Sequence, residues 1–345
     1  MKAAVIRGHG GPEVVQLEEL ADPSPGPGEV VVRVKAASVN HLDLWVCRGW
    51  PGLKLAFPHV LGSDVAGVVE AVGALASSAA QPHVGDEVVV NPSLGCGRCE
   101  RCRAGEENLC LRYAILGEHV SGGQAERLAV RAENVLPKPK NLTFEEAAAV
   151  PLTFLTAWHA LLGRARLRLG ETVLVHAAGS GVGVAAVQIA KLVGARVIAT
   201  AGSDAKLERA RALGADEVVN YETQDFVQEV RRLTGKRGVD VVFEHVGKKT
   251  WEGSIRAVTV GGRIVTVGAT TGFDPPTDLR HVFFRQISIL GSTMGNGAEL
   301  LEVLRFVGEG KLKPVVDRVL PLGEVRRAHE LLAQRAQFGK IVLTP

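Results

Sequence analysis

The sequence predicts an α/β protein with two domains, a small β-rich one and one built on a doubly wound parallel sheet. The chain has 345 residues, which is more than one hydrophobic core usually serves. Its first part consists of short β-rich runs separated by Gly, Pro and Asp turns, and its middle part alternates apolar strands with helices. The middle part is therefore expected to form the parallel sheet.

Composition and charge narrow the class of protein. Hydrophobic residues make up 46% of the chain and charged residues 22%, as in an ordinary globular domain. The net charge is only +3 and no long run of one sign occurs, which argues against nucleic-acid binding. The N-terminus has no signal-peptide pattern, and no apolar run reaches the roughly 18 residues of a membrane span. We expect a cytoplasmic protein that does not bind membranes.

The β-rich domain begins at the N-terminus. The runs EVVVRV, DVAGVVEAV and DEVVV are typical strands of a small barrel or sandwich, and residues 74–83 read as a flexible loop. After the parallel sheet, the chain returns through a helix, a strand, a second helix and the terminal strand GKIVLT. We expect this return to complete the first domain. The predicted boundaries are 1–152 with 293–345 for the β-rich domain, and 153–292 for the parallel-sheet domain.

A predicted helix over residues 145–162 leads from the first domain into the second. Strands and helices then alternate, which indicates a parallel sheet with crossover helices, and six strands suffice for a full Rossmann sheet. The predicted strands cover residues 172–176, 196–200, 217–220, 239–244, 263–267 and 287–290.

The strongest local signal is the segment CGRCERCRAGEENLC, in a lobe of about residues 93–112. It places Cys96, Cys99, Cys102 and Cys110 with two, two and seven residues between them. Four thiolates at this spacing suit a tetrahedral zinc that has no open position and therefore braces structure. A bacterial ferredoxin cluster needs a last gap of three residues and a following proline, so it fits less well, and free or disulfide-linked thiols are the remaining alternative. Cys47 lies apart and is predicted to be an ordinary buried or semi-buried thiol.

A glycine-rich turn follows the first predicted strand of the parallel sheet. In HAAGSGVG the residues Gly179, Ser180, Gly181, Val182 and Gly183 lead directly into a helix. Glycines allow the backbone to approach a pyrophosphate closely, and the helix N-terminus offers free N–H groups. An alanine stands at the first glycine position of the usual motif, so the match is to a variant. We predict a nicotinamide dinucleotide site, with a turn that binds nothing as the alternative.

The end of the second strand usually selects the cofactor. An acid there would bind the ribose 2′-hydroxyl and repel a 2′-phosphate, but Ala201 occupies the position. Ser203 offers a hydrogen bond and Lys206 a positive charge to a 2′-phosphate, so we predict NADP(H) in preference to NAD(H). Asp204 lies close enough in the sequence to keep NAD(H) open.

The order of these signals resembles the medium-chain dehydrogenase/reductase superfamily, which contains zinc alcohol dehydrogenases and quinone reductases. The matching stretches run along essentially the whole chain. They are PGPGEVVVRVKAASVNHLDL, FPHVLGSDVAGVVEAVG, VGDEVVV, the cysteine lobe, LTAWHAL, HAAGSGVG, LGADEVVNY, GGRIVTVG and GKIVL. The resemblance implies a GroES-like catalytic domain, a Rossmann domain and a cofactor bound in the cleft between them.

The sequence departs from the zinc alcohol dehydrogenases at their catalytic metal. Where that family has cysteine, then histidine and an acid, then a second cysteine, this chain has Asn40, then Ser63 and Asp64, then Leu152 or a neighbour. Amide, hydroxyl and isobutyl groups do not replace thiolate and imidazole on Zn²⁺, so we predict one structural zinc per chain and no catalytic zinc. A rearranged metal site could still use acids and histidines nearby in the sequence, namely His41, Asp43, His59 and Asp64.

The Asn40 pattern resembles the zinc-free quinone and enone reductase branch, and that resemblance implies site roles. Asn40 and Thr156 would border the nicotinamide, and Asp43 would orient the local network or merely cap a helix. Trp45 would wall the substrate cleft or belong to the core, and His41 would relay a proton or lie at the rim. Asp64 would also lie in the substrate cleft.

Other residues receive structural or cofactor roles. His159 is predicted to be a core histidine, and His176, at the end of the first strand, is predicted to pack behind the glycine-rich turn. The ends of the fourth and fifth strands, at Val246 and at Val267 with Gly268, would present backbone groups to ribose and carboxamide.

The leading prediction is an NAD(P)(H)-dependent reductase of a quinone, enone or aldehyde. An alcohol dehydrogenase that oxidises small alcohols and a cofactor-binding protein without turnover remain as alternatives. We also expect a homodimer or homotetramer that pairs the edge strand in FFRQISILGS.

Overall fold

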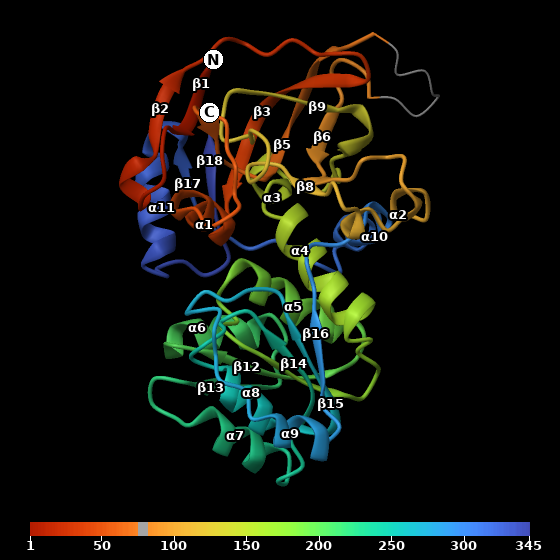
Figure 1. The fold of residues 1–345 in the computed structure, drawn as a ribbon, viewed down its shortest axis with the longest axis vertical. Coiled ribbons are helices and arrows are strands. Elements are labelled where there is room, and N and C mark those ends of the chain that lie inside the picture. Colours follow the sequence, from red (N-terminus) through yellow and green to blue (C-terminus); the bar gives the residue numbers. More distant parts are fainter. Residues whose placement is uncertain (75–81) are drawn as a thin grey trace. The chain divides into compact units, whose positions relative to one another are not determined.

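The computed structural model describes residues 1–74 and 82–345 (Figure 1). Most of the loop predicted at 74–83 lies outside the described residues. The chain divides into two compact units: unit 1 comprises 1–152, 296–310 and 314–345, and unit 2 comprises 153–295 with 311–313. Among the helices that are described, none combines the length and the apolar character needed to cross a bilayer.

Unit 1 is built on a seven-stranded sheet with the path β10-β6-β5-β3-β18-β17, in which β9 also pairs with β3. A second sheet has the order β2-β1-β4, and β7 pairs with β8. The strands are β1 Lys2–Ile6, β2 Gln16–Glu19, β3 Glu29–Val39, β4 His59–Val60, β5 Asp64–Val72, β6 Glu87–Val90, β7 Ser93–Leu94, β8 Ala114–Ile115, β9 Arg127–Arg131, β10 Val135–Pro137, β17 Val316–Pro321 and β18 Lys340–Thr344.

The central strands of unit 1 set the register of its site. In β3, residues 29–39 alternate buried and exposed side chains in the middle and become fully buried toward the end, as expected where a sheet passes from a half-solvated to a covered region. β18 returns antiparallel to β3, with Ile341 opposite Val39. β5 flanks β3 on the other side, with Asp64 opposite Ser38. The C-terminal segment therefore completes the first sheet.

The helices of unit 1 cover one part of its core. The helices are α1 His41–Arg48, α2 Glu100–Arg103, α3 Phe144–Ala147, α10 Gly297–Gly308 and α11 Val325–Ala333, and part of α4 Pro151–Trp158 begins here. α1 and α11 pack together through an apolar cluster that includes Leu44, Val46, Ala328 and Leu343. Burial of the larger of these side chains contributes about 1.5–3 kcal/mol each, so this cluster holds α1 against α11.

Unit 2 contains a six-stranded parallel sheet with the order β13-β12-β11-β14-β15-β16. The strands are β11 Thr172–Val175, β12 Arg196–Ala201, β13 Glu217–Asn220, β14 Val239–Glu244, β15 Val258–Thr266 and β16 Ser288–Gly291. All six predicted strands are present, and their ends agree to within one residue except at the start of β15, which begins five residues earlier. The predicted Rossmann sheet is therefore confirmed.

Helices flank this sheet, and Figure 1 shows α7, α8 and α9 gathered on one side of it. The helices of unit 2 are α5 Gly181–Leu192, α6 Asp204–Ala212, α7 Phe226–Leu233, α8 Trp251–Ala257 and α9 Leu279–Phe284. The predicted helix over 145–162 is wrong as one element, because it breaks into α3, α4 and a π-helical turn, His159–Arg164. Pro151 cannot donate to the preceding turn and disfavours a helical residue before it, so a new helix begins there.

Candidate functional site

The four predicted cysteine ligands come together in unit 1. Their sulfur atoms all lie within 4.8 Å of one another. Cys99 Sγ lies 3.5 Å from Cys102 Sγ and 3.7 Å from Cys110 Sγ, and Cys96 Sγ lies 3.9 Å from Cys102 Sγ. A tetrahedron with Zn–S bonds of about 2.3 Å has S–S edges of about 3.8 Å. The cluster therefore has the size of a four-thiolate zinc site.

Local structure assembles this cysteine cluster. Cys99 caps α2, and the backbone N–H of Cys102 donates to its sulfur at 3.5 Å. The N–H of Arg112 donates to Cys110 Sγ at 3.3 Å. Such bonds favour thiolates, and β7 with β8 closes the lobe at its base. Sulfur donors arranged in this way fit zinc.

A second cluster of polar side chains lies buried in unit 1, where β3, β5 and β18 meet. The ammonium of Lys340 contacts Asn40 Oδ1 and lies 3.0 Å from Asp64 Oδ2. That oxygen also accepts from Ser38 Oγ at 3.0 Å and from Asn40 Nδ2 at 2.9 Å. The side chains of Lys340 and Asp64 are 4% and 0% exposed. We call Ser38, Asn40, Asp64 and Lys340 the ammonium cluster.

Because the ammonium cluster is buried, each of its charges needs a full set of hydrogen-bond partners. Removing a carboxylate or an ammonium from water costs several kcal/mol per ion, which is offset only where each charge is fully partnered. The second oxygen of Asp64 is satisfied as well, because Leu152 N donates to Oδ1 at 2.8 Å. The pair is thus a hydrogen-bonded ion pair held by the sheet register.

The partners of Asn40 fix the orientation of its amide. An ammonium only donates and a carboxylate only accepts, so the amide oxygen must face Lys340 and the amide nitrogen must face Asp64. One N–H of Nδ2 is committed to Asp64. The amide group has a second N–H donor, which a cation on its oxygen makes more acidic.

Asp43 begins a buried chain of polar groups beside Asn40. Its Oδ2 accepts from the Asn40 backbone N–H at 2.8 Å and from Gln124 Nε2 at 3.2 Å, and Gln124 Oε1 lies 3.3 Å from His329 Nε2. Asp43 Oδ1 and His329 Nδ1 are buried without a hydrogen-bond partner. Burial raises the pKa of Asp43 to about 7, although Asn40 and Lys340 act in the opposite direction. Asp43 therefore caps α1 and also belongs to a wider network.

Gly62 lies two residues before Asp64 and packs closely against Gln124. Its φ is +98°, which disfavours a side chain, and a Cβ there would lie 2.5 Å from Gln124 Cγ. The glycine thus lets the segment before β5 pass close to Gln124.

The positions of the expected catalytic-zinc ligands are partly brought together. Asp64 is hydrogen-bonded to both Asn40 and Leu152, whereas Ser63 Oγ is buried without a hydrogen-bond partner. Among the described residues, the cysteine cluster is the one group of three or more His, Cys, Asp or Glu ligands found within metal-binding reach. The predicted rearranged site is not assembled there, and His59 instead contacts the Gly117 carbonyl at 3.1 Å.

Other predicted residues of unit 1 lie on α1. His41 and Trp45 are one helical turn apart, and their rings meet edge to face with centroids 5.3 Å apart. Both side chains are half-buried. Cys47 is buried, as predicted, and burial together with Asp43 raises the pKa of its thiol to about 12.

In unit 2 the glycine-rich turn joins β11 to α5. Ser180 caps the helix by accepting from Gly183 N at 2.9 Å. A Cβ on Gly183 would lie 2.5 Å from the Ala177 carbonyl oxygen, so only glycine lets the helix start this close to the strand. The N–H groups of the first turn, at Gly181 and Val182, have no acceptor within the helix. Free N–H groups at a helix N-terminus can bind an anion, and Gly179 leads into this turn.

The residues that would select the cofactor lie at the start of α6. Ser203 caps this helix, with Lys206 N donating to its hydroxyl at 3.4 Å. Asp204 Oδ1 accepts from Asn220 Nδ2 at 2.8 Å. Ala201 ends β12, so no acid stands at the strand end itself.

A buried network supports the strand ends behind the turn. Glu244 accepts from Val246 N at 2.7 Å and from Ser254 Oγ at 2.7 Å. His176 Nε2 lies 3.0 Å from the same hydroxyl, and the His176 side chain is buried. Burial lowers the pKa of His176. Burial acts to raise the pKa of Glu244, but His176 and the hydrogen bonds outweigh it and the pKa is lowered.

The remaining predicted cofactor residues of unit 2 lie near these strand ends. Val267 N donates to the Glu244 carbonyl at 2.9 Å, and the Gly268 carbonyl accepts from Thr266 Oγ1 at 3.3 Å. Thr156 on α4 is buried, with Oγ1 3.5 Å from Met294 Sδ. His159 is half-buried rather than enclosed in the core.

Sequence reasoning missed Lys340, Ser38, Gln124 and His329. Lys340 opens the strand GKIVL, where a lysine usually reads as a solvated residue before a strand. The one available signal was pairing: a terminal strand beside β3 would place Lys340 level with Asn40. The sequence did not reveal that pairing.

Two family models match the chain. The model described as alcohol dehydrogenase GroES-like domain matches residues 26–140, and the model described as zinc-binding dehydrogenase matches residues 181–309. The first lies in unit 1 and the second mainly in unit 2.

Known proteins are similar along the whole chain. An alcohol dehydrogenase of Geobacillus stearothermophilus is 36% identical over 350 residues, which cover 99% of both chains. A quinone oxidoreductase of Rattus norvegicus is 31% identical over 99% of this chain and 97% of its own. A solved structure described as an NAD-dependent alcohol dehydrogenase is 57% identical, has a TM-score of 0.96 and is matched over 100% of both chains.

Proposed function

The chain belongs to the medium-chain dehydrogenase/reductase superfamily and is an NAD(P)-dependent oxidoreductase, and from this premise we propose that it reduces a carbonyl or activated double bond without a catalytic metal. The ammonium cluster carries the proposal. Where zinc alcohol dehydrogenases hold their metal, this chain has Asn40 and Asp64, and the Lys340 ammonium contacts both. A fixed positive charge thus stands among groups that bind zinc poorly.

Hydride transfer to a carbonyl needs a donor for the charge that develops on oxygen. When bound, the nicotinamide cofactor supplies the hydride. We assign the donor role to the second amide N–H of Asn40, which Lys340 polarises through the amide oxygen. Lys340 and Asp64 are then positioning residues, and Asp43 orients the backbone N–H at which α1 begins.

We assign one structural zinc to the cysteine cluster. Its sulfur spacing supports this, as do the N–H groups that face two of the sulfurs. Four thiolates leave no open position, so the ion would brace residues 93–112 and take no part in hydride transfer.

We assign the cofactor pyrophosphate to the turn from Gly179 to Gly183, and we keep the prediction of NADP(H) over NAD(H). The missing acid at Ala201 and the positive charge of Lys206 support it. The test compares kcat/KM for NADPH and NADH in the protein and in Lys206→Ala. We expect the variant to lose about tenfold for NADPH alone. An equal loss for both cofactors, or a native preference for NADH, would count against the assignment.

The remaining roles stay predictions. Thr156 would border the nicotinamide, and Val246, Val267 and Gly268 would offer backbone groups to ribose and carboxamide. His41 and Trp45 would line the substrate. Cytoplasmic location and homo-oligomerisation are also predictions; the exposed strand β16 at the sheet edge and the exposed side chains of Phe283 and Phe284 support the latter.

The deciding experiment measures metal content and turnover together. Quinones, enones and aldehydes are assayed for NADPH and NADH oxidation, and small alcohols for NADP⁺ and NAD⁺ reduction. We expect about one zinc per chain and the highest kcat/KM with one of the reducible substrates.

A second zinc, whose removal abolishes activity while the cysteine cluster stays loaded, would overturn the metal-free proposal. That result would favour alcohol oxidation, which the name of the solved structure that is 57% identical also suggests. Tight cofactor binding with no turnover on any substrate would favour a non-catalytic binder.

A further inference from the structure

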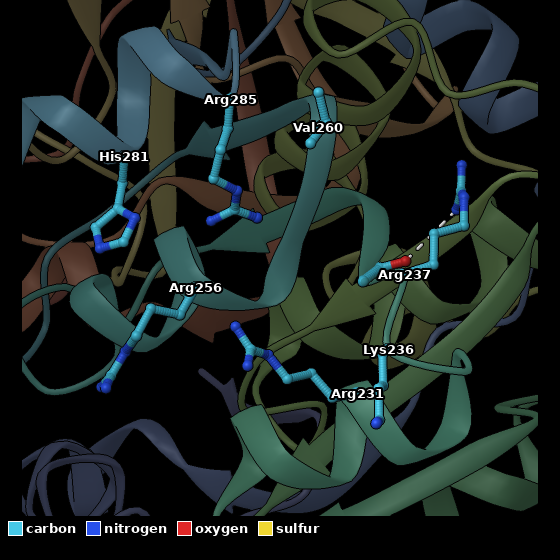
Figure 2. A pocket seen from close by; sticks show the side chains of 8 residues that line it. Arg231, Lys236, Arg237, Arg256, Val260, His281 and Arg285 are labelled. Carbon is cyan, nitrogen blue, oxygen red and sulfur yellow. Dashed lines mark hydrogen bonds between the residues drawn. The ribbon is translucent and has the colours of Figure 1, made fainter.

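A depression lined by basic side chains lies in unit 2, away from the glycine-rich turn (Figure 2). Its volume is about 290 Å³, and the basic residues that line it are Arg231, Lys236, Arg237, Arg256, His281 and Arg285. They come from α7, from the segment before β14, from α8 and from α9 with the residue that follows it. We call this the basic pocket.

The place of the basic pocket in the sheet separates it from the cofactor site. Residues 236–238 lead into β14, and Val260 lies near the start of β15. The glycine-rich turn follows the end of β11, and these strands are parallel. The pocket therefore lies where these strands begin, whereas the turn lies where β11 ends. The two sites are at opposite ends of the strands, so one dinucleotide cannot occupy both.

The positive charge of the pocket is largely uncompensated. No carboxylate is among the residues that line it. Arg237 is neutralised from behind, because its guanidinium donates to Asp240 at 3.1 and 2.5 Å. In the part of the chain that the structure describes, no ion pair is formed by Arg231, Lys236 or Arg256. Several positive charges thus share a small concave surface.

Two guanidinium groups face one another inside the pocket. Arg285 is anchored, since it donates to the carbonyls of Ile255, at 2.7 Å, and of Val258. Figure 2 shows the Arg231 and Arg285 side chains directed toward each other from opposite sides. Burial lowers the pKa of Arg285, and the charge of Arg231 lowers it further. An anion between the two guanidinium groups would relieve this repulsion.

We propose that the basic pocket binds a small anion with two or more phosphate groups, such as a nucleoside polyphosphate or free pyrophosphate. Guanidinium forks match phosphate oxygens in pairs, and several neighbouring cations favour a multivalent ligand over a single carboxylate. The volume is that of a small-ligand site. The net charge of only +3 argues against a nucleic acid.

The test measures pyrophosphate binding to the full-length protein by titration calorimetry at low salt, with NADPH or NADH saturating the turn. We expect binding that weakens with added salt. Arg231→Gln should weaken it about tenfold or more, because a charge-assisted contact is lost. Arg232→Gln is the matched control, since Arg232 is the next residue of the same helix and pairs with Glu229 at 2.7 Å. It should change the affinity less than twofold.

Further probes identify the ligand class. Tighter binding of ATP than of pyrophosphate would indicate a nucleotide, equal binding would indicate the phosphate chain alone, and adenosine should not bind. Size-exclusion chromatography checks that the variants keep the same oligomeric state.

Three results would overturn the proposal. The first is equal pyrophosphate affinity in the native protein and Arg231→Gln. The second is pyrophosphate binding that disappears when either cofactor is saturating, because the turn would then be the site. The third is neither heat nor a thermal shift at millimolar pyrophosphate.

Discussion

In unit 1 the cysteine cluster takes its four thiols from residues 96–110, whereas the ammonium cluster joins Lys340 to side chains that are 276 and 300 residues away. Three of the cysteines are partly exposed, while the ammonium cluster is buried. The cysteine cluster needs only its own loop and an ion. The ammonium cluster forms only when β3, β5 and β18 pair in one register. It is therefore lost when the sheet unfolds.

The largest effect is expected when the cysteine cluster loses one of its thiols. Cys99→Ser should lower the zinc content from about one per chain to near zero, since structural zinc in small domains is held by about 10–16 kcal/mol. The lobe of residues 93–112 should become sensitive to protease, while the ammonium cluster stays intact. Metal analysis and limited proteolysis measure both.

Cys47→Ser is the control for the cysteine cluster, because Cys47 is a buried thiol outside it. It should leave the zinc content near one. If Cys99→Ser kept its zinc, the cysteine cluster would not be the metal site.

The next largest effect is expected for Lys340→Met, which tests the ammonium cluster. It leaves Asp64 buried without its cation, and breaking a buried pair costs about 3–5 kcal/mol in the free energy of unfolding. Denaturant unfolding measures this cost. The Lys340→Met/Asp64→Asn double variant should lose less than the sum of the two single variants. A single-variant cost below 1 kcal/mol would show that the ion pair does not hold the sheet register.

A further test is the pH dependence of the unfolding free energy, which depends on Asp43 beside the ammonium cluster. Asp43 has a pKa of about 7 in the folded protein and an ordinary value of 3.8 in the unfolded chain. Between these values only the folded state holds the proton, so stability falls as the pH rises and levels off above 7. From pH 5 to pH 8 this amounts to roughly 3 kcal/mol.

Asp43→Asn should remove this fall in stability between pH 5 and pH 8, because the asparagine side chain cannot ionise. The measurement is the difference in unfolding free energy between the native protein and Asp43→Asn at pH 5 and at pH 8, in which other titrating groups cancel. A difference that does not change with pH would mean that Asp43 ionises normally.

The smallest expected effect concerns one hydrogen bond of the ammonium cluster. Ser38→Ala removes the donor that lies 3.0 Å from Asp64 Oδ2, while Lys340, Asn40 and Leu152 still satisfy the carboxylate. The expected loss is about 1–2 kcal/mol in unfolding free energy. Zinc content should not change, and a fall in zinc would show that the two clusters are coupled.

Much of the fold could be predicted because its signals are local. Strand and helix periods, the Gly179–Gly183 turn and the four cysteines are all written in segments shorter than 20 residues. The helix at 145–162 failed because the steric effect of Pro151 outweighed its apolar pattern.

The sequence by itself determined which residues could bind a metal or a pyrophosphate, because ligand type and spacing within one loop decide both. Only the tertiary structure decided that Lys340 meets Asn40 and Asp64, and that Arg231 faces Arg285. Such contacts depend on strand pairing and helix packing between distant segments, and a shift of one residue along β18 would turn Lys340 to the other face of the sheet.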